Sequence, residues 1–186
     1  MRLFTGLDLP AETVGRIDAV IAACRPLAKI RWSKAANLHV TTKFIGEWPA
    51  ERLEELKSRL AEIPPRGPIE VAVRGFGWFP TPHNPRIFWA AIHAPQALRE
   101  LAAATDAACA ELGAAAETKP YTPHLTLARI EPRGGGPAPD LAPLRRAIAS
   151  MRSSEFGSFV AREFHLYLSE PEAGGSRYTE LASFPT

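Results

Sequence analysis

The sequence predicts an α+β protein whose strands are mainly antiparallel. First, an order of β-rich segment, helical pattern and second β-rich segment occurs twice along the chain. Second, the last two β-rich segments flank a Gly-rich turn, as expected for a hairpin. Third, 186 residues with 46% hydrophobic and 23% charged side chains suffice for one sizeable core or two small lobes.

In the first half, a β-rich segment ends at Pro10, after which Val14, Ile17 and Ile21 share one helical face. The Pro-rich run 64–68 is a firm break. The elements predicted here are a helix from residue 11, a charged helix at 51–63, and strands at 2–9, 29–32, 37–46 and 69–79.

In the second half, the run Arg133–Pro137 is read as a linker, because it lacks the Lys and Ser or Thr of a phosphate-binding P-loop. The turn at 170–176 separates the last two strands. The elements predicted here are helices at 96–112 and 141–151, and strands at 86–93, 123–130, 159–169 and 177–184.

The two halves match at a constant separation of 85 residues. An internal duplication, about 1–80 and 86–186, is the simplest interpretation, against chance matching in an Ala-rich chain. The identities at this separation are Pro10 with Pro95, Cys24 with Cys109, His39 with His124, and Thr41 with Thr126.

The repeated His-x-Thr pattern predicts a polar site on each of two strands. Alternation in a strand places His39 and Thr41 on one face, and His124 and Thr126 on another. A histidine pair can hold one neutral and one protonated ring at the same pH, and threonine hydroxyls donate to phosphate oxygens. The combination suits metal-free cleavage of a phosphoester.

Two cations follow the motifs and are candidate partners of a phosphoryl anion. Lys43 shares the face of His39 by alternation, whereas Arg129 nominally points away from His124 and needs a bulge or a long reach. A solvated position at the strand end is the other interpretation of Arg129. Tyr121 and Phe79, with Trp32, are candidates to stack on a base at the rim, although buried packing is the commoner role of aromatic residues.

Other classes of site and partner fit less well. Neither motif has a second His or a carboxylate at a metal-ligand spacing, and a pair of repeated histidines is rarely structural alone. A net charge of +2 lacks the dense basic footprint of a duplex binder. Two cysteines, an early Pro10 and the short apolar runs predict a soluble, cytoplasmic protein without disulfide, signal peptide or membrane span.

Four stretches resemble the two-histidine (2H) phosphoesterase superfamily. They are HVTTKFIGE at 39–47, PHLTLAR at 123–129, the opening MRLFTGLDLP, and GGSRYTELASFP at 174–185. Within the superfamily the chain looks like the bacterial and archaeal RNA 2′,3′-cyclic phosphodiesterases, also described as 2′-5′ RNA ligases. The resemblance implies one domain over residues 1–186, with two pseudo-symmetric lobes around a central cleft.

The same resemblance implies opening of a 2′,3′-cyclic phosphate at an RNA end to a 2′-phosphomonoester, without metal or cofactor. His39 would be the proton donor and His124 the proton acceptor, with Thr41 and Thr126 holding phosphate oxygens. We expect Lys43, Arg129, Tyr121 and Phe79 to contact substrate, and the protein to be a monomer. Thr42 departs from the usual apolar residue, for which we expect an effect on packing only.

Two alternatives keep the same residues. One is an RNA- or nucleotide-binding module in which the histidines only bind a phosphate. The other is a 2H phosphoesterase for a different cyclic phosphate. Turnover of a 2′,3′-cyclic nucleotide in EDTA separates an enzyme from a binding module.

Overall fold

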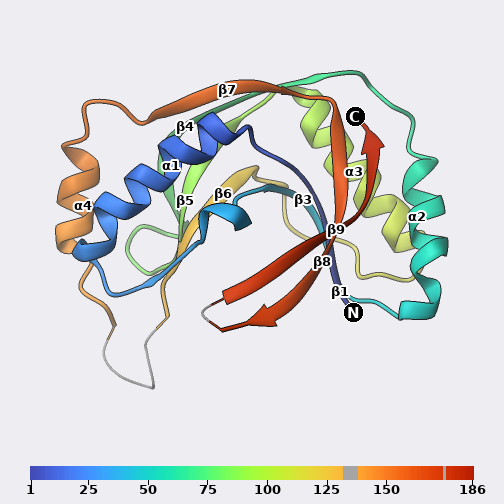
Figure 1. Cartoon of the computed structure of the whole chain (residues 1–186), viewed down its shortest axis with the longest axis horizontal. Coiled ribbons are helices and arrows are strands. Elements are labelled where there is room, and N and C mark those ends of the chain that lie inside the picture. The colour runs from blue at the N-terminus through green and yellow to red at the C-terminus, as the bar shows by residue number, and fades with distance from the viewer. Residues whose placement is uncertain (132–137, 174) are drawn as a thin grey trace.

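The computed structural model describes residues 1–131, 138–173 and 175–186, and its strands form two antiparallel sheets (Figure 1). The four-stranded sheet, in the order β3-β1-β8-β9, contains β1 (Arg2–Leu7), β3 (Val40–Glu47), β8 (Glu163–Glu172) and β9 (Gly175–Pro185). The five-stranded sheet, in the order β2-β6-β5-β4-β7, contains β2 (Arg31–Trp32), β4 (Ile69–Pro80), β5 (Pro85–His93), β6 (His124–Arg129) and β7 (Glu155–Ala161). The predicted α+β class with antiparallel strands is confirmed.

Helices flank the sheets at the two ends of the molecule. In Figure 1, α1 (Ala11–Cys24) and α4 (Ala142–Ala149) lie on the left, and α2 (Leu53–Ala61) and α3 (Gln96–Glu111) on the right. The described residues also form the 3₁₀ turns η1 (Arg25–Leu27), η2 (Ala35–Asn37) and η3 (Ala50–Arg52). Among the described residues, no helix has the length and apolar character needed to cross a membrane.

Each sheet contains strands from both halves of the sequence. The pair β1–β3 in one sheet corresponds to the pair β5–β6 in the other, as the separation of 85 residues requires. However, β4 of the first half pairs with β5, and β8 of the second half pairs with β1. The helices cross over too, because α1 contacts β7 and α3 contacts β3. The two sheets are therefore not the two halves of the chain.

Several predicted boundaries need correction. The strand expected at 37–46 begins only at Val40, because residues 35–37 form η2. The strand expected at 159–169 is two strands, β7 and β8, which separate at Arg162 and join different sheets. The linker predicted at 133–137 lies outside the described residues.

A bulge interrupts each motif strand three residues after its histidine. On β3 the register skips Thr42, since Gly6 pairs with Thr41 and Thr5 with Lys43. On β6 it skips Leu127, since Trp89 pairs with Thr126 and Phe88 with Ala128. A bulge puts two consecutive residues toward one side and so reverses the alternation beyond it. Both bulges decide which side chains reach the site.

Candidate active site

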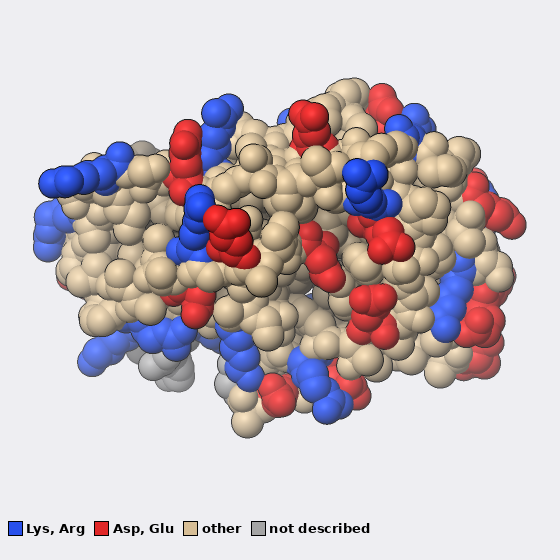
Figure 2. Space-filling model, turned by 45° about the horizontal axis from the view of Figure 1, so that its top comes forward, with Lys and Arg blue, Asp and Glu red and all other residues tan. Residues whose placement is uncertain are grey.

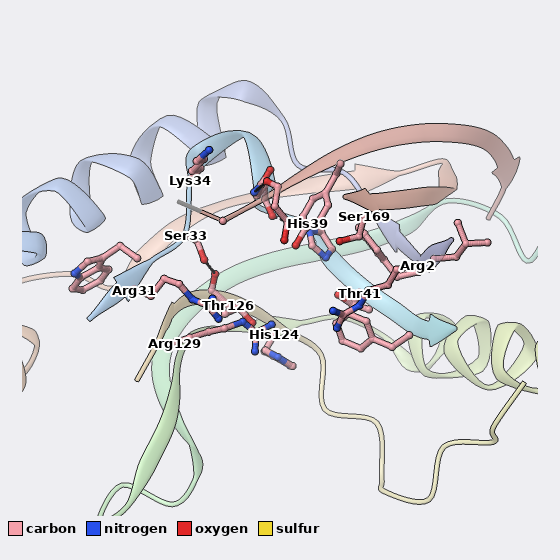
Figure 3. A pocket seen from close by; sticks show the side chains of 18 of the residues that line it. Arg2, Arg31, Ser33, Lys34, His39, Thr41, His124, Thr126, Arg129 and Ser169 are labelled. Carbon is pink, nitrogen blue, oxygen red and sulfur yellow. Dashed lines mark hydrogen bonds between the residues drawn. The ribbon is translucent and has the colours of Figure 1, made fainter. Parts of the chain in front are cut away.

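Both motif strands border one pocket of about 340 Å³ (Figure 3). His39 and Thr41 line it from the β3 side, and His124 and Thr126 line it from β6. Figure 3 shows the two histidines on opposite sides of the same space. The volume lies at the small end of the range for ligand sites, roughly 300 to 1,000 Å³.

Both imidazoles are held in the same way by the backbone. His39 Nδ1 lies 2.8 Å from the carbonyl oxygen of Asn37, and His124 Nδ1 lies 2.8 Å from that of Thr122. A carbonyl oxygen only accepts hydrogen bonds, so Nδ1 bears the proton in each neutral ring. Nε2 is then left with its lone pair, free to take a proton or, once protonated, to give one.

The rings have different aromatic neighbours. Phe4 lies 4.5 Å from His39 between ring centroids, and Tyr178 meets the same ring edge-on at 5.2 Å. Phe79 meets His124 edge-on at 5.0 Å. These contacts fix the ring planes and exclude water from one side of each.

Burial lowers the pKa of both histidines. For His39 it lowers the pKa to about 4, against a rise from the hydrogen bond to Asn37 and from the charge of Asp8. The charges of His124 and Arg129 lower it further. Burial is also the main cause that lowers the pKa of His124, with Arg129 again adding to it. In the ligand-free protein both rings are therefore neutral at pH 7, and two protonated rings repel.

Hydroxyl groups hold the backbone of both motif threonines. Tyr121 Oη donates to the carbonyl oxygen of Thr41 at 2.8 Å, and Ser33 Oγ donates to that of Thr126 at 2.6 Å. Each bond ties a motif strand to a segment that is distant in sequence. The threonine hydroxyls thus project from a backbone fixed on both sides of the pocket.

The bulges place Phe44 and Arg129, five residues after His39 and His124, in the pocket wall. Arg2, Arg31 and Lys34 are further cations of the wall, and Glu131 is its acidic side chain among the described residues. This excess of positive charge suits an anion such as a phosphate. Elsewhere, on the face shown in Figure 2, basic and acidic side chains are interspersed without a continuous basic tract.

Comparisons with known proteins identify the family of this chain. A family model described as LigT-like phosphoesterase matches residues 7–89 and 92–178. The chain belongs to the LigT-like phosphoesterase family. The RNA 2′,3′-cyclic phosphodiesterase of Thermus thermophilus is 32% identical over 99% of this chain and 89% of its own length. That of Archaeoglobus fulgidus is 27% identical over 99% of both chains. The crystal structure of E. coli LigT with 3′-AMP matches with a TM-score of 0.77 and 28% identity, covering 99% of this chain and 97% of LigT.

In this LigT-like phosphoesterase, Lys43 does not lie where alternation predicts. The bulge at Thr42 turns Lys43 away from the pocket, and the side chain is 4% exposed. Its ammonium lies 2.5 Å from Asp106 Oδ1 and donates to the carbonyl oxygen of Ala115 at 2.6 Å. The placement of Lys43 at the phosphate is therefore wrong, and the residue instead ties β3 to α3 and the segment that follows it.

Two predicted aromatic contacts also need correction. Neither Tyr121 nor Phe79 is among the described residues that line the pocket. Tyr121 is a brace between the motif strands, and burial raises the pKa of its phenol. Phe79 packs against Trp89, with ring centroids 4.8 Å apart, and meets the ring of His124 edge-on. The aromatic residues that line the pocket are Phe4, Trp32, Phe44 and Tyr178. Of these, the sequence predicted only Trp32 as a residue that could stack on a base.

Thr42 and His165 of this LigT-like phosphoesterase lie outside the pocket lining. Thr42 Oγ1 shares a buried hydrogen bond of 2.7 Å with Thr5 Oγ1, as expected for a packing role. His165 lies between Asp8 and Glu180, with Nδ1 3.4 Å from Glu180 Oε2. Neither residue belongs to the constellation of His39 and His124.

Proposed function

We propose that this LigT-like phosphoesterase hydrolyses 2′,3′-cyclic phosphates at RNA ends to 2′-phosphomonoesters. The observation that supports this proposal is the pair of imidazoles, each with Nδ1 bound to a carbonyl and Nε2 left free, in one pocket with Arg129. Curated relatives over the full chain length have the name RNA 2′,3′-cyclic phosphodiesterase.

In the proposed reaction, one imidazole is the base and the other is the acid. His124 Nε2 takes a proton from water as the water oxygen forms a bond to phosphorus. The bond from phosphorus to O3′ breaks, and His39 Nε2 gives its proton to O3′, leaving the phosphate on O2′. Exchange of these protons with solvent restores the starting state. General acid–base catalysis of this kind contributes roughly 10² to 10⁴ in rate.

His39 must be protonated to act as the proton donor, but burial keeps the ring neutral in the free protein. Binding of the anionic substrate raises the pKa of this ring. A ring with a pKa of about 4 holds a proton in about one molecule in a thousand at pH 7. A phosphate anion in contact with the ring favours the protonated form by about 4 kcal/mol at 4 Å for an effective dielectric constant near 20. The anionic substrate therefore charges the ring that must donate.

The remaining groups stabilise the phosphoryl oxygens. In the proposed reaction Thr41 and Thr126, which line the pocket, donate hydrogen bonds to these oxygens, and Arg129 balances the negative charge that grows in the transition state. These donors sit on strands whose backbone is already fixed, so little reorganisation accompanies the reaction. The proposed chemistry uses no metal-bound hydroxide.

Turnover of a 2′,3′-cyclic nucleotide in EDTA tests the proposal. We expect the native protein to release the 2′-phosphomonoester, and His39→Ala and His124→Ala each to lose about 10² to 10⁴ in kcat/KM. His93→Ala is the matched control, because this exposed imidazole bonds to the Arg74 carbonyl away from the pocket.

Three results would contradict the proposal. Stoichiometric binding without turnover would indicate a binding module. Turnover restricted to cyclic phosphates that lack a nucleoside would indicate another substrate class. Near-native activity of either alanine variant would remove the paired mechanism.

The proposed cellular setting is the cytoplasm, with the chain acting as a monomer and as one bilobal domain over residues 1–186. Cys24 and Cys109 are buried free thiols, which suits a reducing compartment. Sedimentation at micromolar concentration tests the monomer. A single cooperative unfolding transition tests the single domain.

A further inference from the structure

Asn37 contacts both His39 and the β8–β9 hairpin. It ends η2, and its carbonyl oxygen accepts the Nδ1–H bond of His39 at 2.8 Å. Its side-chain amide donates to the carbonyl oxygen of Ser176 at 2.6 Å. One residue therefore joins a histidine of the site to a segment 139 positions away in the chain.

The hairpin forms one wall of the pocket and contacts His39 directly. Ser169, Ser176 and Tyr178 line the pocket, and the Tyr178 ring stands nearly perpendicular to that of His39, at 86°. A second tie to the same region, between Lys34 and Glu172, joins two half-exposed side chains. Exposed ion pairs contribute little, so the part-buried Asn37 bond is the stronger anchor of the hairpin.

The His124 side of the site shows no such anchor among the described residues. Thr122, 85 positions after Asn37, gives His124 the same carbonyl contact at 2.8 Å. In the part of the chain that the structure describes, its side chain makes no hydrogen bond to a pocket wall. The Asn37–Ser176 bond therefore belongs to the His39 side alone among the described residues, unlike the bond from Nδ1 to a backbone carbonyl, which both histidines make.

We propose that Asn37 is a positioning residue that couples the seating of the β8–β9 hairpin to the orientation and burial of His39. When its amide holds Ser176, the hairpin presses Tyr178 against the imidazole and shields it from water. Loss of the bond frees the hairpin, so the ring gains both water and rotational freedom. This inference rests on the proposed function, in which His39 is the proton donor.

Asn37→Ala tests the inference, with Glu172→Gln as the matched control. The first variant removes the part-buried anchor of the hairpin and the second removes the exposed one, while both keep the backbone carbonyl that His39 needs. We expect Asn37→Ala to lower kcat for a 2′,3′-cyclic nucleotide about tenfold to hundredfold, with KM within about twofold, as misplacement of a reacting group does. Glu172→Gln keeps the native kcat; it releases Lys34 of the pocket wall, so any change is confined to KM.

An NMR titration of the histidine rings gives a readout that does not depend on turnover. In Asn37→Ala the pKa of His39 should rise from about 4 toward 6.5, because burial is the main cause of its low value. The titration of His124 should stay as in the native protein. Asp8 and Arg129, whose charges also act on His39, are unchanged in the variant.

The outcomes separate this inference from the proposed function. If the native protein turns over no cyclic phosphate, the proposed function fails, and the titration still tests the coupling of Asn37 to His39. A rise in KM alone, with kcat and the His39 titration unchanged, would make Asn37 a substrate contact and overturn the inference. Unchanged values throughout would overturn it too. If Asn37→Ala does not fold, Asn37→Ser, whose hydroxyl is too short to reach Ser176, gives the same comparison.

Discussion

The variant Lys43→Met tests whether Lys43 stabilises the fold or binds the phosphate. The structure buries Lys43 against Asp106, which is 25% exposed, and so predicts a loss of stability without a loss of chemistry. Breaking a buried ion pair costs about 3 to 5 kcal/mol. Asp106 keeps part of its hydration and still accepts from the Glu117 backbone amide, which lowers the expected cost to about 2 to 3 kcal/mol.

Urea unfolding and steady-state turnover together measure the two effects. We expect Lys43→Met to lose about 2 to 3 kcal/mol of unfolding free energy and to change kcat/KM less than about threefold. Arg129→Met, which removes a cation that does line the pocket, should show the reverse, with kcat/KM lower by about 10² to 10³. A folded Lys43→Met protein with a loss of kcat/KM equal to that of Arg129→Met would refute the reasoning from the bulge.

Three further predictions concern the two histidines and the residues that support the motif strands. The alkaline limb of the kcat/KM profile should lie below pH 6.5, because burial lowers the pKa of both rings and the protonated ring is lost as pH rises. The alkaline limb of the kcat profile should lie at higher pH, because the bound anion favours the protonated ring. An alkaline limb above pH 8 in kcat/KM would contradict this prediction. Thr42→Val should cost about 1 to 2 kcal/mol in urea unfolding by leaving Thr5 without its partner, with unchanged turnover, whereas a loss of turnover would bring Thr42 into the site. Tyr121→Phe should cost about 1 kcal/mol and lower kcat a few-fold through the Thr41 carbonyl; unaltered kcat would deny it a bracing role.

The sequence predicted the parts of the site that local rules govern. Alternation over three residues is enough to put His39 with Thr41 and His124 with Thr126, and the structure finds all four side chains in one pocket. The composition of each segment also gave most helices and strands to within a few residues, because Pro10, the Pro-rich run 64–68 and Pro95 interrupt the chain where elements change. These features could be predicted because they depend on residues that are close together in the sequence.

Features that depend on pairing between strands far apart in the sequence could not be predicted from local patterns. The β8–β9 hairpin reaches His39 only because β8 pairs with β1, about 160 residues earlier. No local pattern marks Tyr178 as a residue of the pocket wall. The bulges at Thr42 and Leu127 could not be predicted from the sequence either. One bulged residue is polar and the other is apolar, so residue type does not mark the position. Because the bulge at Thr42 was not predicted, alternation put Lys43 on the wrong face of its strand. For Arg129, alternation left a bulge, a long reach and a solvated strand end open, and the structure has the bulge.

The two bulges help to explain why two strands with the same His-x-Thr pattern give their histidines different surroundings. Each turns the residue five positions after its histidine into the pocket, but that residue is Phe44 on one side and Arg129 on the other. Phe44 remains 57% exposed and supplies an apolar surface, whereas Arg129 supplies charge that acts on both rings. The Asn37–Ser176 hydrogen bond, which has no counterpart on the His124 side among the described residues, adds to this difference. The two imidazoles therefore face different surroundings despite identical hydrogen bonds at Nδ1. Acid–base catalysis needs one ring that gives a proton and one that takes it. Two strands with the same His-x-Thr pattern can therefore take different roles when only the residues around each ring differ.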